Sequence, residues 1–252
     1  MRAGTYPYEG DGDGLVTGWH SHDLHQLEYA VEGTVEVETR AGHYLLPPQQ
    51  AVWIPAGLRH QTTIERRVRT VSVFFDPAQF PDAGDEARVL AAAPVIREMI
   101  LHGTRWPIDR EGSDEVADSF FRTLGHLVGE WLDRETPLYL PRSTDPVVSA
   151  AMTYTDHHLA HVSAAEVSRS VGLSERSLRR RFPAHAGISW RSYLLQTRLL
   201  RAMVLLAEPG PTVLDVATRV GFESVSAFTR TFAQHVGETP SAYRRRTVAK
   251  PS

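Results

Sequence analysis

The stretches VSRSVGLSERSLRRRFPAHAGISWRSY (residues 167–193) and VATRVGFESVSAFTRTFAQHVGETPSAY (residues 216–243) decide the fold of the second half of the chain. They are two copies of one pattern, with similar spacing of apolar residues around Gly172 and Gly221 and one residue inserted in the second copy. Each copy predicts a short helix, a tight turn and a second helix, since glycine adopts the left-handed backbone that such a turn needs. The repeat therefore predicts two helix-turn-helix units in tandem.

The second helix of each unit is expected to bury one face and expose the other. Leu178 and Phe182 lie four residues apart in the first unit and face the core, as do Phe228 and Phe232 in the second. The apolar stretch between the copies, WRSYLLQTRLLRAMVLLAEPG (190–210), predicts one long helix that holds the units at a fixed separation. Two recognition helices on one side of DNA lie about one helical turn, roughly 34 Å, apart.

The charge of the chain is divided unevenly between its halves. Residues 1–145 contain 13 basic and 23 acidic residues, a net charge of −10, whereas residues 146–252 contain 14 basic and 7 acidic residues, a net charge of +7. This asymmetry indicates that only the second half meets a polyanion. The chain has no cysteine, no apolar run near the ~20 residues of a membrane span and no signal-peptide pattern at its start. We therefore expect a cytoplasmic protein without disulfides, thiolate metal sites or a membrane partner.

Residues 150–246 resemble the DNA-binding domain of AraC/XylS-type transcription regulators. The segments AAEVSRSVGLSERSLRRRF (164–182) and VLDVATRVGFESVSAFTRTFAQHVGETPSAYRR (213–245) carry the resemblance. In that family the second helix of each unit enters the major groove, where arginine suits the O6 and N7 atoms of guanine. The resemblance implies base-reading roles for Arg176, Arg179 and Arg180 in the first unit and for Val225, Ser226, Thr229 and Arg230 in the second. It implies phosphate contacts for Arg181, Arg191, Arg244, Arg245 and Arg246.

The first half is expected to consist mostly of β-strands followed by helices. Short apolar runs with alternating polar residues and Gly/Pro turns over residues 26–76 predict a small barrel or sandwich. Residues 1–14 are expected to be loose, and DEARVLAAAPVIREMILHG (85–103) is expected to be helical with a break at Pro94. Residues 114–134 have the periodicity of an amphipathic helix, which either packs on its own barrel or forms a dimer contact.

The stretch GWHSHDLHQLEYA (18–30) places three histidines within six positions. His20 and His22 have the spacing of metal ligands, because alternate residues of a strand point the same way. His25 has the wrong parity for that face and is expected in a turn. The pattern by itself fits either a metal site or hydrogen-bonded polar side chains at the mouth of a barrel.

A second segment, PAGLRH (55–60), completes a resemblance to the two signatures of the cupin barrel. The resemblance implies a divalent metal, Zn, Ni, Cu or Fe, held by His20, His22, Gln26 and His60. Gln26 stands near the place where metal cupins have a carboxylate, so a metal-free pocket stays the alternative. The combined segments also resemble a cupin-bearing AraC subgroup that includes drug-efflux and nitroimidazole-resistance regulators, so the resemblance extends over nearly the whole chain.

These observations predict a two-domain protein, with an all-β cupin-like barrel that carries added helices and an all-α tandem helix-turn-helix. The predicted effector-sensing and dimerisation domain spans residues 1–140, and the predicted DNA-binding domain spans residues 150–252. A linker is expected at residues 141–149, overlapping the proline-rich stretch 136–146.

We expect a transcription regulator that binds a specific sequence of double-stranded DNA and senses a small molecule or metal in the cupin pocket. It is expected to be a homodimer, to contact RNA polymerase and not to be an enzyme. The alternative is a metal-dependent cupin enzyme with a helical appendage, which requires a bound metal with an open coordination position. The sequence support for that alternative is limited to His20, His22 and His60.

Overall fold

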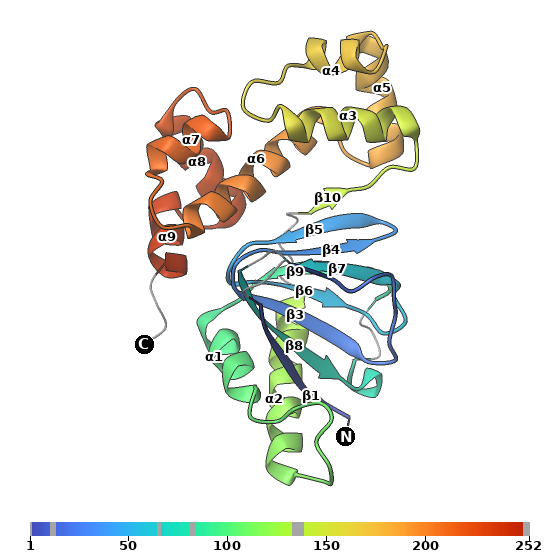
Figure 1. Cartoon of the computed structure of the whole chain (residues 1–252), viewed down its shortest axis with the longest axis vertical. Helices are drawn as coiled ribbons and strands as arrows, with labels where there is room; N and C mark the ends of the chain where they lie inside the picture. The colour runs from blue at the N-terminus through green and yellow to red at the C-terminus, as the bar shows by residue number, and fades with distance from the viewer. Residues whose placement is uncertain (1, 11–13, 65–66, 81–83, 133–138, 249–252) are drawn as a thin grey trace. The chain divides into compact units, whose positions relative to one another are not determined.

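The computed structural model describes residues 2–10, 14–64, 67–80, 84–132 and 139–248 (Figure 1). The chain forms two compact units, one containing Met1–Arg40 and Tyr44–Pro137 and the other containing Ala41–His43 and Leu138–Ser252. The first unit is built on β-strands and the second on helices. This division confirms the predicted fold class, a β-barrel domain with added helices followed by an all-α domain.

Two antiparallel five-stranded sheets form the barrel (Figure 1). The first sheet has the order β1 (Gly4–Gly10), β8 (Val68–Phe75), β3 (His25–Glu32), β6 (Gln50–Ile54) and β9 (Arg88–Ala91). The second has the order β10 (Leu140–Pro141), β5 (Gly42–Leu46), β4 (Val35–Thr39), β7 (His60–Ile64) and β2 (Leu15–Val16). Strand β10 pairs with the first two residues of β5, Gly42 and His43.

Alternation along the strands gives the first sheet an outer and an inner face. Leu27 of β3 lies on the outer face, in a buried cluster that includes residues of α1 (Pro94–Gly103) and α2 (Glu115–Leu132). Complete burial of such a side chain contributes about 1.5–3 kcal/mol to folding. Gln26 and Glu28 alternate with Leu27 and therefore face the second sheet, inside the barrel.

Helix α2 packs its apolar stripe on its own barrel, which is one of the two predicted alternatives (Figure 1). Phe121, Leu124 and Val128 are completely buried in the cluster beneath it. The side chain of Asp114 caps the helix by accepting a hydrogen bond from the Val116 amide. The stripe therefore serves the core of its own unit, and a role of this helix in dimerisation stays a prediction.

Two predictions for the first half were wrong, and both failures concern pairing between distant segments. Residues 1–14 were expected to be loose, but Gly4–Gly10 pair along their whole length with β8. Residues 88–91 were expected to be helical, but they form β9 and pair with β6. Pro94 begins α1 and does not interrupt a longer helix, because the first turn of a helix does not need the missing proline N–H.

Part of the predicted linker is structured. Residues 136–138 lie outside the described residues, whereas Leu140 and Pro141 form β10. Helix α3 (Pro146–His157) begins before residue 150, the predicted start of the DNA-binding domain. It begins there because the Asp145 side chain accepts hydrogen bonds from two amides of its first turn.

Seven helices of the described residues build the second unit and confirm the tandem helix-turn-helix (Figure 1). They are α3, α4 (Ala164–Ser170), α5 (Glu175–Ala186), α6 (Trp190–Ala207), α7 (Val213–Arg219), α8 (Val225–Val236) and α9 (Pro240–Val248). Helices α4 and α5 form the first unit of the repeat, α7 and α8 form the second, and α6 connects them. The turn glycines have the predicted left-handed backbone, with φ of +66° at Gly172 and +82° at Gly221. In the described parts of the chain, no helix has the length and apolar character needed to cross a membrane.

Candidate nucleic-acid interface and candidate metal centre

Helix α5 presents arginines on the side opposite to its buried face. Leu178 and Phe182 are 3% and 0% exposed and anchor the helix in the core of the second unit. Arg176, Arg179 and Arg180 are exposed. An exposed helix face rich in arginine can donate hydrogen bonds to base edges and phosphates in a major groove.

Helix α8 carries less charge on the equivalent face. Ser226 and Arg230 are exposed, whereas Val225 and Thr229 are half-buried. Arg230 occupies the position that Arg180 has in the first copy of the repeat. The two recognition helices are thus built alike but differ in the number of donors that they offer to DNA.

Arg181, which is expected to contact phosphate, has a partner inside the second unit. Its Nε and Nη2 atoms donate to the two carboxylate oxygens of Asp145 at 3.1 and 2.5 Å. Asp145 also caps α3, so one carboxylate ties the start of α3 to the recognition helix α5. This ion pair would compete with a phosphate for the guanidinium of Arg181, and a role of Arg181 in DNA binding stays a prediction.

We expect Asp145→Asn to destabilise the second unit near neutral pH and to have a diminishing effect as the pH falls from about 4 to about 2. The hydrogen bond from Arg181 lowers the pKa of Asp145 from 3.8 to about 2. A carboxylate whose pKa is lower in the folded state stabilises that state above its unfolded pKa, and the contribution disappears as the pH falls through the folded pKa. Asparagine also caps helices, so the substitution isolates the ion pair. Urea unfolding at several pH values measures the effect, and a difference that does not change with pH would contradict it.

The arginines of α9 differ in how accessible they are, although all three were predicted to contact phosphate. Arg244 is half-buried, with its Nε and Nη2 atoms inside the second unit. Arg246 donates to Glu238 through Nε at 3.1 Å and Nη2 at 2.5 Å. Arg245 is exposed. Arg245 is thus the most accessible of the three, and the phosphate contacts of α9 stay predictions.

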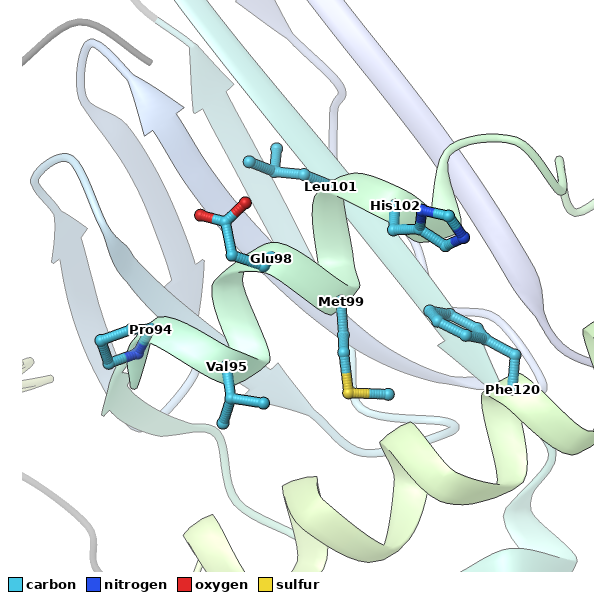
Figure 2. Close-up of a pocket in the computed structure, with 7 residues that line it drawn as sticks. All are labelled: Pro94, Val95, Glu98, Met99, Leu101, His102 and Phe120. Atoms are coloured by element: carbon cyan, nitrogen blue, oxygen red, sulfur yellow. The ribbon is translucent and has the colours of Figure 1, made fainter. Parts of the chain in front are cut away.

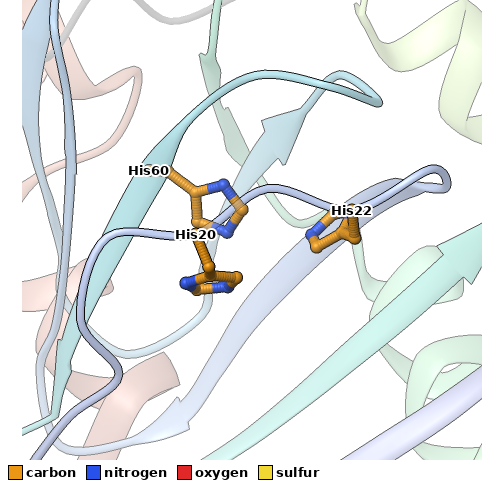
Figure 3. A group of neighbouring side chains, drawn as sticks. All are labelled: His20, His22 and His60. Carbon is orange, nitrogen blue, oxygen red and sulfur yellow. The ribbon is translucent and has the colours of Figure 1, made fainter.

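The three predicted histidine ligands come together in the barrel, but not by the predicted strand alternation. His20 and His22 lie between β2 and β3, outside any named strand, and His60 is the first residue of β7. The loop is held against β7 because His20 and His60 exchange two main-chain hydrogen bonds of 2.9 Å. The potential ligand atoms of the three side chains all lie within 4.8 Å of one another. Figure 3 shows the three imidazole rings gathered at one place.

Each ring is oriented by a hydrogen bond between its Nδ1 atom and a main-chain carbonyl. The partners are Gly18 O for His20 at 3.0 Å, Leu24 O for His22 at 2.7 Å and Leu58 O for His60 at 2.9 Å. A carbonyl only accepts, so each Nδ1 carries the proton and each Nε2 of the neutral ring keeps its lone pair. Histidines that bind metals are oriented in the same way, by donation from the other ring nitrogen.

His60 is the most deeply buried of the three histidines, with an exposed fraction of 0%. Its Nε2 atom is buried and has no hydrogen-bond partner among the described residues. Burial lowers the pKa of His60 to about 4, because the charged ring is disfavoured away from water. The ring is therefore neutral near physiological pH and available as a ligand.

Gln26 completes the cluster from β3. Its amide Nε2 donates to Glu28 Oε2 at 3.0 Å and to Ser72 Oγ at 3.1 Å, which turns Oε1 toward His22. Gln26 Oε1 lies 2.8 Å from His22 Nε2, although both atoms are acceptors in the neutral arrangement. A bound cation would satisfy both lone pairs, so the donors present fit a metal ion.

The sequence reasoning missed Glu28 and Ser72, which orient the amide of Gln26. Glu28 Oε2 also accepts a hydrogen bond from Ser72 Oγ, and the two residues are direct partners in the register of β3 and β8. Burial raises the pKa of the Glu28 carboxyl. The strand period of two could have identified Glu28, since it lies two residues after Gln26 on the same face. The pairing with Ser72 has no local sequence signal.

His25 does not belong to the cluster, and its predicted place in a turn was wrong. It is the first residue of β3 and stacks on Trp53 with ring centroids 4.9 Å apart. Its Nδ1 atom accepts a hydrogen bond from Ala56 N at 2.9 Å. Burial lowers the pKa of His25. The imidazole is thus a part of the core on the outer face of the sheet.

A groove lies between α1 and α2 in the first unit (Figure 2). The residues that line it are mainly apolar: Pro94, Val95, Glu98, Met99, Leu101, His102 and Phe120. Its polar side chains, one carboxylate and one imidazole, do not form a converging set of ligands. The histidine cluster is therefore the better candidate for a specific effector site.

The folds of the two units and the comparisons with known families define the class of this protein. Residues 2–139 match the AraC-like ligand binding domain, and residues 167–246 match a helix-turn-helix domain. The chain belongs to the AraC family of transcriptional regulators and combines a ligand-binding domain with a DNA-binding domain of the helix-turn-helix type.

Individual relatives are regulators as well. The HTH-type transcriptional regulator NimR of Escherichia coli K12 is 27% identical over 243 residues, which cover 95% of this chain and 86% of NimR. The transcriptional activator RhaR of Pectobacterium atrosepticum is 48% identical over 73 residues, 29% of this chain and 26% of RhaR. Similar solved structures include an AraC-type regulator from Chromobacterium violaceum, with 27% identity, a TM-score of 0.40 and coverage of 43% of this chain and 97% of that one. They also include ToxT from Vibrio cholerae, with 14% identity, a TM-score of 0.41 and coverage of 99% of both chains.

Proposed function

We propose that this AraC-family regulator recognises a specific promoter sequence through α5 and α8, and that a metal ion in the histidine cluster controls this recognition. The observation that carries the proposal is the convergence of four lone pairs inside the ligand-binding domain. Each belongs to a group whose other polar atom is held by a hydrogen bond. Such convergence is unfavourable unless a shared cation or donor occupies the site.

The number of exposed arginines supports different roles for the two recognition helices in reading DNA bases. Helix α5 offers three exposed arginines, and each bidentate arginine–guanine pair discriminates between bases by about 1–3 kcal/mol. Helix α8 offers Arg230 and the hydroxyl of Ser226, whereas Val225 would either contact a thymine methyl group or read no base. We infer that α5 reads a guanine-containing part of the operator and that α8 reads fewer bases.

We expect Arg230→Ala to weaken binding to the preferred DNA site by about 1–3 kcal/mol and to change binding to random DNA much less. Arg245→Ala is the matched control, since this exposed arginine is predicted to contact phosphate and should reduce binding to both DNAs similarly. The preferred site is obtained by selection from random duplexes, and affinities are measured by gel shift at physiological salt. If no sequence is enriched, the proposed specific recognition is wrong. If Arg230→Ala lowers the affinity for both DNAs equally, Arg230 contacts phosphate and does not read a base.

His20, His22, His60 and Gln26 would hold the ion, and the donor set of imidazole nitrogens and one amide oxygen suits Zn, Ni, Cu or Fe. When bound, the ion would supply a Lewis-acidic centre to which an effector can attach. The carbonyls that hold the imidazoles, together with Glu28 and Ser72, keep these donors in place before binding. An effector changes DNA affinity only when it binds two arrangements of the protein unequally.

The role that we propose for the site is sensing and not turnover. The relatives named above are transcription regulators, which supports this choice. A protein that regulates transcription acts where the DNA is, and we therefore place it in the cytoplasm. Assembly into a homodimer and contact with RNA polymerase stay predictions.

A further inference from the structure

The four donors of the histidine cluster are all neutral. Three are imidazole nitrogens, assigned to Nε2 because each Nδ1 is held by a main-chain carbonyl, and one is the amide oxygen of Gln26. In the part of the chain that the structure describes, no carboxylate joins this group of potential ligands. A divalent ion held by these residues would therefore keep its full double positive charge.

The two nearest acidic residues along the chain are engaged elsewhere. Asp23 follows His22 directly, but its carboxylate pairs with Arg2 at 2.6 Å, and both side chains are largely exposed. Glu28 is separated from the donors by the side chain of Gln26, since its Oε2 atom accepts hydrogen bonds from Gln26 Nε2 and Ser72 Oγ. Neither carboxylate is a ligand in this cluster, and Glu28, behind Gln26, supplies at most one negative charge against the two positive charges of a divalent ion.

A positive charge without a nearby negative charge is energetically unfavourable in the histidine cluster. His60 is completely buried, and His20 and His22 are half-buried. Charges out of contact with water are stabilised mainly by an opposite charge close by, because the effective dielectric constant is low. The partial exposure of His20 and His22 shows that the cluster is not sealed from solvent. Four protein donors also leave a coordination position open on an ion that accepts five or six ligands.

We propose that the effector of this site is a small carboxylate anion that coordinates the metal and neutralises its charge. This inference rests on the metal site proposed above. Gln26 determines the preference for an anionic effector, because a carboxylate in its place would supply the negative charge from the protein itself. The neutral amide thus makes the site selective for anions over neutral molecules of the same shape.

The test uses the full chain loaded with Co²⁺, whose visible absorption bands respond to each change of ligand. Acetate is the probe, and acetamide is a neutral control of nearly the same shape. We expect saturable spectral changes with acetate and none with acetamide at the same concentrations. Unchanged spectra with acetate, or equal responses to the two compounds, would overturn the inference. Failure of Co²⁺ to bind at all would instead contradict the proposed metal site.

Two variants test whether the neutral amide of Gln26 makes the site prefer an anion. Gln26→Glu should retain Co²⁺ and weaken acetate binding at least about tenfold, because like charges at adjacent ligand positions repel. Asp23→Asn is the control, and it should leave acetate affinity within about threefold of the original, since this carboxylate is largely exposed and paired with Arg2. Acetate affinity that is unchanged in Gln26→Glu, or reduced as much in Asp23→Asn as in Gln26→Glu, would show that the anion is not selected by the neutral donor set. Should Gln26→Glu fail to fold, the acetate–acetamide comparison still decides.

Discussion

Replacing Gly221 with alanine is expected to destabilise the helical unit by about 2–5 kcal/mol and to remove specific DNA binding. The backbone at Gly221 has φ of +82°, a conformation that costs an L-residue about 1–2 kcal/mol. An added Cβ would also collide with Ala160 O and lie 2.6 Å from Arg198 Nη2. Such overpacking costs a further 1–3 kcal/mol or so.

The collision affects more than the turn itself, because a displaced Arg198 would lose its hydrogen bonds and its contact with Phe222. Its Nε and Nη2 atoms donate to Leu159 O at 3.2 and 3.1 Å, and its guanidinium lies 6.0 Å from the ring centre of Phe222. Arg198 on α6 thereby joins the α3–α4 connection to the turn of the second helix-turn-helix unit. Displacing it should disturb the placement of α8 relative to α5, and so the simultaneous binding of both helices to one face of DNA.

Gly172 provides a matched control within the same chain. It occupies the equivalent turn of the first unit and has φ of +66°, but a Cβ there would meet no atom within 4 Å. Gly172→Ala should therefore cost only the backbone strain, about 1–2 kcal/mol. Chemical unfolding followed by far-ultraviolet circular dichroism, together with gel shift on the preferred site, measures both variants. Equal destabilisation of the two would show that the contact with Ala160 and Arg198 does not matter.

Replacing His60 with alanine is expected to lower the affinity for a divalent metal by more than about 100-fold. Residues that merely support metal ligands already contribute about 10–100-fold, and His60 is proposed as a direct ligand with a preoriented Nε2. His126→Ala is the control, since this histidine is exposed on α2 and lies outside the cluster. Titration of chelator-treated protein with Zn²⁺ against a coloured competitor gives the affinities.

The same variants connect the metal to DNA. Under the proposed mechanism, the DNA affinity of the unchanged protein and of His126→Ala responds to metal, and that of His60→Ala does not. His60 is completely buried, so circular dichroism must first establish that the variant folds. His20→Ala, at a half-exposed position, tests the same point with less risk to the core. Metal affinities of His60→Ala and His20→Ala equal to that of His126→Ala would refute the metal site.

Local signals along the sequence predicted most of the helical unit. The recognition helices follow from apolar residues four apart, such as Phe228 and Phe232, and from turn glycines between two helices. The capping boxes that the structure shows at Ser163 and Thr212 were not used in the prediction, but they are equally local. These interactions join residues within one or two helical turns, so a window of the sequence contains both partners.

The barrel and its site were predicted less completely. His20, His22 and His60 were selected from two separated motifs, and they do lie together. The reason given for them was incorrect, because main-chain hydrogen bonds hold His20 to His60 of β7 and His22 to Gly57, and strand alternation does not place them. Similarly, β1 forms through pairing with β8, although its own side chains carry no regular apolar pattern.

The sequence by itself determined that the chain has two domains, that the second is a tandem helix-turn-helix and that histidines 20, 22 and 60 belong to one site. The tertiary structure alone decided that Arg181 faces Asp145, that Glu28 and Ser72 orient Gln26 and that His25 lies in the core. The physical reason is the distance along the chain between interacting groups. Helical periodicity and caps act between near neighbours, whereas a side chain acquires its partner, its burial and its pKa from segments brought to it by folding.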